Sequence, residues 1–371
     1  MPTPQNFWAG LFPASAGPGR GVRIELRLLK KGGRPFLLLP GQPRPAAATL
    51  DLYPAQTRRA RMARALVRCL LRASLPLGTE RVSLAIWPED PFARFLSSLA
   101  GESLPALPAL GILAGNPMSD GQRFLLLVFD AGQRPVAVVK AGLSQRARAL
   151  VEQEERFLAA VPEKTLAIPR LRAKFDSPRL RALALDFFPG DSPLPRHEAA
   201  LLSLLSAWVD PERTIILSDA PDWTRLQTAA SARDLFSVVA APLRGRTLHP
   251  AIHHGDFAPW NIKVSPAGAW TALDWERGEL TGIPGWDWFH YVIQSGILVE
   301  HLPATLLVQR VESLLSSGAF RQYAVCAGIL GCERDLALAY LLHVVEVVKP
   351  SEGLAPTREL LEALADRWRK L

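Results

Sequence analysis

The chain has 371 residues, of which 49% are hydrophobic and 21% are charged, and its formal net charge is +8. This length exceeds what one compact core accommodates and predicts two or three lobes. The apolar runs are far shorter than the roughly 18 residues of a membrane span, and three cysteines without a CxxC pair disfavour a disulfide framework or a zinc site. The N-terminus shows no signal-peptide pattern, so we expect a cytoplasmic protein without a membrane span.

The first 100 residues form a distinct stretch of mixed α and β character. Alternating apolar residues and a Lys-Lys-Gly-Gly turn predict a β-hairpin, and later segments predict a helix and a strand. The expected elements are the hairpin at 22–39, the helix at 57–73 and the strand at 82–87. We interpret residues 1–100 as an N-terminal extension of unknown role.

Most of the basic residues are scattered along the chain, but one cluster lies on the helix predicted at residues 57–73. Spacings of three and four residues place several arginines on one helix face; these are Arg58, Arg59, Arg61, Arg64 and Arg68. A solvent-exposed face is the favoured interpretation, and an anion-binding surface is the alternative. Because no interleaved aromatics, helix-turn-helix or zinc-finger pattern accompanies the cluster, we expect no nucleic-acid partner.

From residue 107 onward the pattern of strands and helices sharpens. The expected order is strand, turn, strand, strand, helix and strand, at 110–113, 115–121, 123–129, 135–140, 144–160 and 183–188. A strand that ends in Lys140, followed by a helix and another strand, is the order of the small ATP-binding lobe of kinases. Beyond residue 193 the sequence is mostly helical, apart from a motif-rich segment at 252–290.

Two short strings in that segment carry the chemistry. The first is His254-Gly-Asp256-Phe-Ala-Pro-Trp-Asn261, and the second is Thr271-Ala-Leu-Asp274-Trp-Glu. Phosphoryl transfer requires a group that orients the attacking hydroxyl and oxygen ligands for magnesium on the phosphates. An Asp followed five residues later by an Asn supplies both from one loop, and Asp274 offers a second carboxylate to the metal.

These strings resemble the aminoglycoside phosphotransferase and choline kinase family, which is related to the protein kinases, over about residues 107–371. The resemblance implies that Asp256 is the catalytic base, that Asn261 and Asp274 are metal ligands, and that His254 packs under the loop. Asp287 matches a later structural Asp of the family. ATP and Mg²⁺ are the implied cofactors, and a small-molecule hydroxyl is the implied phosphate acceptor.

The family also has a strand lysine that holds the α- and β-phosphates, and Lys140 matches it. Its carboxylate partner is expected on the next helix, which offers Glu152, Glu154 and Glu155. We favour Glu154 because it stands four residues before Leu158, the spacing that the family usually shows. A solvated acidic helix face is the alternative for Glu154.

Two further nucleotide contacts are expected in the small lobe. In the turn at 115–121, Ser119, together with Asn116 and backbone amides, is a candidate phosphate contact, with a plain turn as the alternative. The segment from Ala184 to Gly190 resembles the family's linker between lobes, where Asp186 and Phe188 are expected near the adenine. An ordinary buried strand is the alternative there.

Several aromatic and histidine residues surround the motif. Trp275 and Trp286 are expected in the core, although an aromatic cage for a cationic or sugar ligand is the alternative. His253 receives no function, and His290 and His343 are interpreted as hydrogen-bonded helix histidines rather than ligands.

We therefore expect an α+β, two-lobed protein-kinase-like fold: a small, mainly antiparallel β lobe at 101–190 and a helical catalytic and substrate lobe at 191–371. The predicted function is an ATP-dependent kinase of a small-molecule hydroxyl. A faint likeness to kinase-like proteins of bacterial polysaccharide metabolism favours a sugar or glycoconjugate acceptor. The alternatives are a nucleotide-binding pseudokinase scaffold, a kinase for an amino-alcohol such as choline, and an anion-binding module. The sequence leaves the oligomeric state open.

Overall fold

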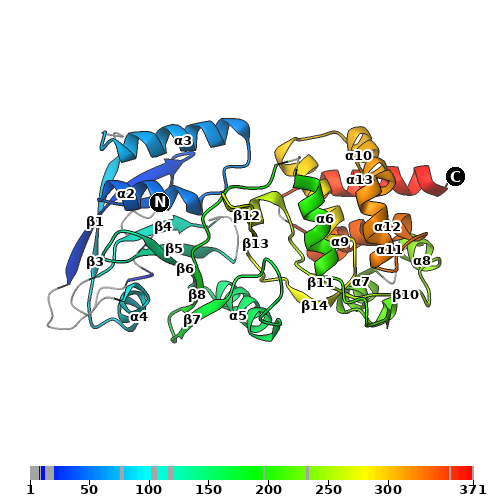
Figure 1. Ribbon diagram of the computed structural model, residues 1–371, viewed down its shortest axis with the longest axis horizontal. Coiled ribbons are helices and arrows are strands. Elements are labelled where there is room, and N and C mark those ends of the chain that lie inside the picture. Colours follow the sequence, from blue (N-terminus) through cyan, green and yellow to red (C-terminus); the bar gives the residue numbers. More distant parts are fainter. Residues whose placement is uncertain are drawn as a thin grey trace. The chain divides into compact units, whose positions relative to one another are not determined.

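The computed structural model describes residues 8, 10–12, 21–75, 79–101, 107–115, 121–194, 197–230, 234–350 and 352–369. The chain divides into two compact units, each described by itself (Figure 1). Unit 1 comprises residues 1–159 and 169–190, and unit 2 comprises residues 160–168 and 191–371.

Unit 1 is built on one antiparallel sheet. Its strands in the described residues are β1 (Val22–Lys31), β2 (Arg34–Pro40), β3 (Glu80–Ile86), β4 (Leu110–Ala114), β5 (Arg123–Phe129), β6 (Pro135–Gly142), β7 (Leu171–Asp176) and β8 (Arg181–Asp186). They follow the order β3-β1-β2-β4-β5-β6-β8-β7, and every neighbouring pair is antiparallel.

The N-terminal stretch and the expected small lobe share this sheet. β2 pairs with β4, with Leu37 opposite Leu113 and Leu38 opposite Ile112. Residues 22–40 and 80–86 therefore add three strands to the five that follow residue 107, and β4 is not an edge strand. The stretch interpreted as an extension is thus continuous with the lobe through backbone hydrogen bonds and through a common core.

Side chains that alternate along the strands fill two separate apolar layers. Leu38 and Leu126 belong to one layer, and Leu37 and Leu127 belong to the other, because successive strand residues point to opposite faces. Helix α4 (Pro91–Ala100) contributes to the first layer, while α2 (Pro43–Thr49) and α3 (Arg58–Arg72) cover the second. Helix α5 (Gln145–Ala160) follows β6. The elements α2, α4 and β7 were not expected from the sequence.

Unit 2 is mainly helical. Its longer helices are α6 (Glu198–Ala207), α7 (Pro221–Ala230), α8 (Asp234–Ala240), α9 (Trp286–Gln294), α10 (Ala304–Ser316), α11 (Gly318–Cys326), α12 (Glu333–His343) and α13 (Leu354–Arg369). Short antiparallel pairs join β9 (Ile215–Ile216) to β10 (Thr247–Leu248), β11 (Ala251–His253) to β14 (Glu279–Gly282), and β12 (Ile262–Val264) to β13 (Trp270–Ala272). None of the helices within the described residues has the length and apolarity to span a bilayer.

An antiparallel sheet with a helix after its lysine-bearing strand, followed by a helical unit, is the α+β architecture of the protein-kinase-like fold. The expected fold class is therefore confirmed. The boundary between the units falls at residues 190 and 191, at the end of the expected linker.

Asp90 gives a test of how α4 is attached to the sheet. Its carboxylate accepts from the backbone amides of Phe92 and Ala93 and pairs with Arg179 at 3.1 Å. Asp90→Ala should lower the free energy of unfolding by about 1–2 kcal/mol in urea titrations, because the helix loses its cap. Asp90→Asn keeps a capping oxygen and should lose less. The neighbouring exposed Glu89→Ala serves as the control, and an equal loss in all three variants would contradict this account.

Candidate functional site

Lys140 lies near the end of β6 and forms a buried ion pair with Glu154 on α5. Its Nζ stands 2.6 Å from Oε1 and 2.7 Å from Oε2 of Glu154, and the two side chains are 8% and 1% exposed. Two charges removed from water need each other as partners, since either one alone would be strongly destabilising. The pair fixes the direction in which the Lys140 ammonium points.

The neighbouring glutamates of α5 have other partners. Glu155 binds Lys174 and Arg181, at 3.0 and 2.9 Å, and Glu152 binds Arg181 at 3.1 Å. The structure thus pairs Lys140 with the glutamate that the sequence spacing favoured. A merely solvated acidic face is ruled out for Glu154, which is buried.

The other predicted nucleotide contacts of unit 1 are Asp186, Phe188 and Ser119. Asp186 is the last residue of β8, its side chain is 56% exposed, and it lies 3.9 Å from Arg172. Phe188 follows it and is half-buried, just before the unit boundary. Ser119 lies outside the described residues.

In unit 2, the loop after β11 is held by the carboxylate of Asp287, in the first turn of α9. The backbone amides of His254 and Gly255 donate to Asp287 Oδ2 and Oδ1, at 2.7 and 3.1 Å. Gly255 has φ +76°, and a Cβ there would stand 2.8 Å from the Cβ of Arg277. Only glycine accommodates both the turn and this close approach, which explains its place before Asp256.

The side chain of His254 is hydrogen-bonded to the backbone of the loop. It is fully buried, its Nδ1 accepts from the Asp256 amide at 3.2 Å, and its Nε2 donates to the Leu273 carbonyl at 2.8 Å. Burial lowers its pKa, and a neutral ring with the proton on Nε2 satisfies both contacts. The position implied by the family resemblance, under the loop, is the one that His254 occupies.

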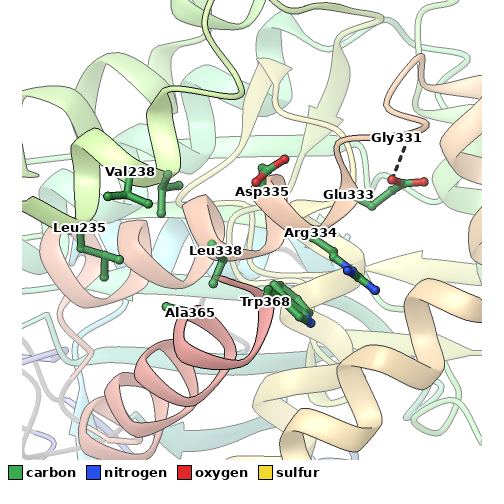
Figure 2. A pocket seen from close by; sticks show the side chains of 10 residues that line it. Leu235, Val238, Gly331, Glu333, Arg334, Asp335, Leu338, Ala365 and Trp368 are labelled. Atoms are coloured by element: carbon green, nitrogen blue, oxygen red, sulfur yellow. Dashed lines mark hydrogen bonds between the residues drawn. The ribbon is translucent and has the colours of Figure 1, made fainter. Parts of the chain in front are cut away.

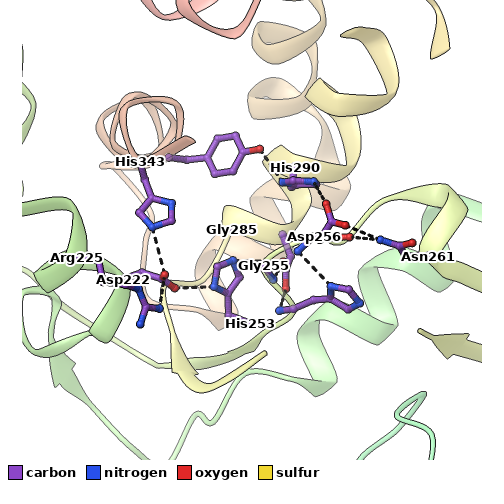
Figure 3. Close-up of polar contacts among 12 residues, drawn as sticks. Asp222, Arg225, His253, Gly255, Asp256, Asn261, Gly285, His290 and His343 are labelled. Atoms are coloured by element: carbon purple, nitrogen blue, oxygen red, sulfur yellow. Dashed lines mark hydrogen bonds and ion pairs between the residues drawn. The ribbon is translucent and has the colours of Figure 1, made fainter. Parts of the chain in front are cut away.

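Both carboxylate oxygens of Asp256 accept hydrogen bonds (Figure 3). Asn261 Nδ2 donates to Oδ2 at 2.9 Å, and His290 Nε2 donates to Oδ1 at 3.1 Å. Tyr340 in turn contacts His290 Nδ1 at 3.0 Å. Burial would raise the pKa of Asp256, but the hydrogen bond and charge of His290 and the charge of Arg277 bring this pKa below its usual value. Asp256 is therefore a fixed carboxylate near neutral pH.

The two expected metal ligands, Asn261 and Asp274, flank the β12–β13 hairpin. Asn261 precedes β12, Asp274 follows β13 by one residue, and Ile262 stands opposite Ala272. The Leu273 amide also donates to the Asn261 carbonyl at 2.7 Å, so the two candidates are at the same end of the hairpin. Asp274 adopts φ +75°, a conformation that non-glycine residues rarely hold without a compensating reason. This donor set, one amide and one carboxylate oxygen, fits a magnesium ion that also takes phosphate oxygens.

Behind the loop lies a buried charge network (Figure 3). His253 donates from Nδ1 to Asp222 at 2.7 Å, and its Nε2 lies 3.4 Å from Asp287. Asp222 also binds Arg225 at 2.7 Å and lies 3.4 Å from His343. Burial alone would lower the pKa of His253, but Asp287 and Asp222 raise it to about 9. His253 is therefore a cation that joins two buried carboxylates.

Sequence reasoning assigned His253 no function and did not consider Asp222 at all. Asp222 precedes His253 by 31 residues, and two of its partners, His253 and His343, lie on other elements. The one available signal was the pair of adjacent histidines at 253 and 254. The hydrogen-bonded state expected for His290 is present, but its partner is Asp256, which the sequence did not indicate.

The large aromatic side chains of this segment form core rather than a ligand cage. Trp275 and Trp286 are fully buried, and the Trp275 ring lies 4.4 Å from that of His254. The expected core position is confirmed for both. Trp260, beside Asn261, is only half-buried.

A separate pocket of about 360 Å³ occurs elsewhere in unit 2 (Figure 2). Leu235, Val238 and Leu338 form part of its wall, and Arg334 stands over the Trp368 ring at 5.7 Å. Its lining shares no residue with the Asp256 loop, so the candidate site is defined by Asp256, Asn261 and Asp274 and not by this pocket.

Comparisons with known proteins give structural matches alone: neither a family model nor a curated protein matches the chain. A thermostable mutant of aminoglycoside phosphotransferase APH(4)-Ia, in complex with AMP-PNP and hygromycin B, is 14% identical. The match covers 74% of this chain and 97% of that one, with a TM-score of 0.47. A putative fructosamine-3-kinase from Haemophilus somnus 129PT is 14% identical over 73% and 96% of the two chains, with a TM-score of 0.43.

Aminoglycoside phosphotransferase APH(3'')-Id from Streptomyces rimosus ATCC10970 is 13% identical over 68% and 97%, with a TM-score of 0.40. At these levels of identity and TM-score the matches carry no argument about chemistry. The chemistry rests on the contacts described above.

The charge network predicts how stability depends on pH. Because the folded-state pKa of His253, about 9, exceeds its ordinary value of 6.5, its contribution is complete below pH 6.5 and is lost as the pH rises toward 9. The loss should be on the order of 3 kcal/mol. Asp222→Asn should flatten this decline in urea titrations between these pH values.

The exposed Asp210→Asn in the same unit should keep the wild-type slope, which makes it the matched control. If Asp222→Asn does not fold, His253→Gln removes the same titrating group. A wild-type slope in both His253→Gln and Asp222→Asn would show that another group carries the pH dependence.

Proposed function

We propose that this chain is an ATP- and magnesium-dependent kinase that transfers the γ-phosphoryl group to a hydroxyl of a small molecule. The observation that carries the proposal is the Asp256 carboxylate, whose two oxygens are held by Asn261 and His290 on a loop anchored by Asp287. Such fixation costs conformational freedom and is expected where a carboxylate must meet a substrate in one orientation.

In this proposal Asp256 accepts the hydrogen bond of the attacking hydroxyl and takes its proton as the oxygen–phosphorus bond forms, while the bond from the γ-phosphorus to the β-phosphate oxygen breaks and ADP leaves. The lowered pKa of Asp256 makes it a weak base, which suits a loose transition state in which proton transfer is late. Asn261 keeps the carboxylate from rotating. Magnesium held by Asn261 and Asp274 would neutralise phosphate charge as it develops.

Lys140 is proposed to bind the α- and β-phosphates through its ammonium group, which Glu154 directs. Asp186, the last residue of β8, and Phe188, two residues further on, are proposed contacts of the adenine, largely through their backbone. Ser119 remains a proposed phosphate contact from the sequence alone.

The acceptor is proposed to be a sugar or glycoconjugate hydroxyl. Trp260, half-buried and directly before Asn261, gives the loop an aromatic surface of the kind on which sugar rings pack. The overall positive charge disfavours a strongly cationic acceptor such as an aminoglycoside. An amino-alcohol is the alternative acceptor, and a scaffold without turnover is the alternative function.

Binding of nucleotide can be tested without knowing the acceptor. ATP with magnesium should raise the melting temperature, because a ligand at 100 times its Kd stabilises the folded state by about 2.7 kcal/mol. Asp274→Ala should remove the magnesium-dependent part of this shift, whereas Asp210→Ala should retain it. No shift for folded wild type at saturating nucleotide would contradict ATP binding, and an unchanged shift in Asp274→Ala would contradict the metal assignment.

Turnover distinguishes the kinase from the scaffold. Asp256→Asn should reduce kcat by roughly 10²- to 10⁴-fold, since the amide is a far poorer base. Nucleotide affinity should stay nearly constant, because the amide keeps the shape of the carboxylate and Asp256 is not among the proposed nucleotide or metal contacts. The assay is ATP hydrolysis, together with transfer to pooled sugars and amino-alcohols. Asp210→Asn is the matched control; equal rates for wild type and Asp256→Asn, without any phosphorylated product, would favour the scaffold.

A further inference from the structure

Helix α3 of unit 1 contains 15 residues, of which six are arginines and none is acidic. Thr57 caps its N-terminus by accepting from the Ala60 amide at 3.1 Å. The helix packs beside α2 (Figure 1), on the layer that covers one face of the sheet. The proposed kinase chemistry uses none of its residues.

The inner face of α3 is attached to unit 1. Leu71 is buried, and Val67 packs against the same core layer. Arg64 donates to the Tyr53 carbonyl at 3.2 Å, and Arg68 pairs with Asp51. These two arginines therefore serve the attachment of the helix to its own unit.

The outer face combines exposed apolar side chains with arginines. Met62 and Leu66 are 65% and 61% exposed, and Cys69, one turn further along, is also exposed. At 100° per residue these three fall within one narrow sector of the helix. Arg58 and Arg59 border this stripe, and Arg61 and Arg72 lie further round the helix on the Cys69 side. None of these four arginines has a hydrogen-bond or ion-pair partner among the described residues.

An exposed apolar stripe flanked by arginines is complementary to a partner that is both anionic and apolar. We propose that α3 lies in the surface of an anionic lipid bilayer, where Met62 and Leu66 enter the acyl boundary and the bordering arginines contact lipid phosphates. Such a surface offers both properties in one plane. The inference is independent of the kinase proposal.

Two other occupants fit the outer face less well. A nucleic acid would leave Met62 and Leu66 against a phosphate backbone, and the stripe has no aromatic ring for base stacking. A second copy of the chain, paired through the same face about a twofold axis, would bring arginines opposite arginines without an acidic residue on α3 to neutralise them.

The direct test is flotation of the full chain with lipid vesicles. The protein should bind vesicles of phosphatidylcholine mixed with roughly one-third phosphatidylglycerol. Binding to phosphatidylcholine alone should be much weaker, and added salt should weaken binding to the anionic vesicles, because the arginine contribution is screened.

Variants separate the charged from the apolar contribution. Joint replacement Arg58→Gln, Arg59→Gln and Arg72→Gln should weaken partitioning roughly 100-fold, at about fivefold for each arginine. Met62→Ser with Leu66→Ser should weaken it by about tenfold or more at unchanged charge. The matched control is Arg94→Gln, Arg146→Gln and Arg321→Gln, which removes three exposed arginines elsewhere and should bind like wild type. Melting curves establish that each variant is folded.

Four results would overturn the proposal. One is absence of binding by folded wild type, and another is equal weakening in the Arg94, Arg146 and Arg321 control. A third is arginine-dependent binding to single-stranded RNA that Met62→Ser and Leu66→Ser leave unchanged, together with an absence of vesicle binding. The fourth is a dimer in sedimentation velocity that these serine substitutions dissociate. ATP hydrolysis measured without lipid should be the same in all α3 variants, so failure here is separable from failure of the kinase proposal.

Discussion

The carboxylate of Asp287 has little access to water, and the loop that carries Asp256 is built on its hydrogen bonds. Two consecutive backbone amides donate to it, and the imidazolium of His253 lies beside it. A buried carboxylate is costly unless its charge and its acceptor sites are satisfied, so the arrangement has few alternatives. His253 is in turn held by Asp222, which Arg225 neutralises from the far side. The position of Asp256 therefore depends on two buried carboxylates, those of Asp287 and Asp222, whose charges must both be neutralised.

The requirement that a buried charge have a partner also applies in unit 1. Lys140 and Glu154 form a buried ion pair in which the ammonium contacts both carboxylate oxygens. A buried ion pair contributes little net stability compared with apolar side chains of similar size, so stability alone does not explain its presence. Asp274 has a left-handed backbone conformation, which Asp adopts more readily than most non-glycine residues. Both features belong to residues proposed to hold the phosphates and the metal.

Unit 1 also shows how an additional segment becomes part of an existing sheet. Pairing of β2 with β4 covers what would otherwise be an exposed edge, and α2 and α3 cover the apolar face that the added strands extend. This leaves α3 with its inner face occupied and its outer face carrying arginines around an apolar stripe. The extension thus stabilises the lobe and presents the surface for which we propose a bilayer.

The sequence by itself determined the elements whose signal is local. The hairpin at β1 and β2, the helices α3 and α5, and the strands β5, β6 and β8 follow from periodicity and turn residues. The choice of Glu154 as the partner of Lys140 came from the spacing usual in the family that the sequence resembles. Asp256, Asn261 and Asp274 were predicted as site residues because their spacing within one short segment resembles the family pattern, and their roles stay predictions. Helices α2 and α4 and strand β7 were missed, although Asp90 and Pro91 form a recognisable start for α4.

Only the tertiary structure decided which distant residues meet. The contacts of Asp222 with His253, of His290 with Asp256 and of β2 with β4 join segments far apart in the chain, and no local pattern encodes them. Whether a histidine is neutral or charged depends on those neighbours: adjacent His253 and His254 have pKa values displaced in opposite directions. Residue type limits which proton states are accessible, but burial and partners supplied by the fold select among them.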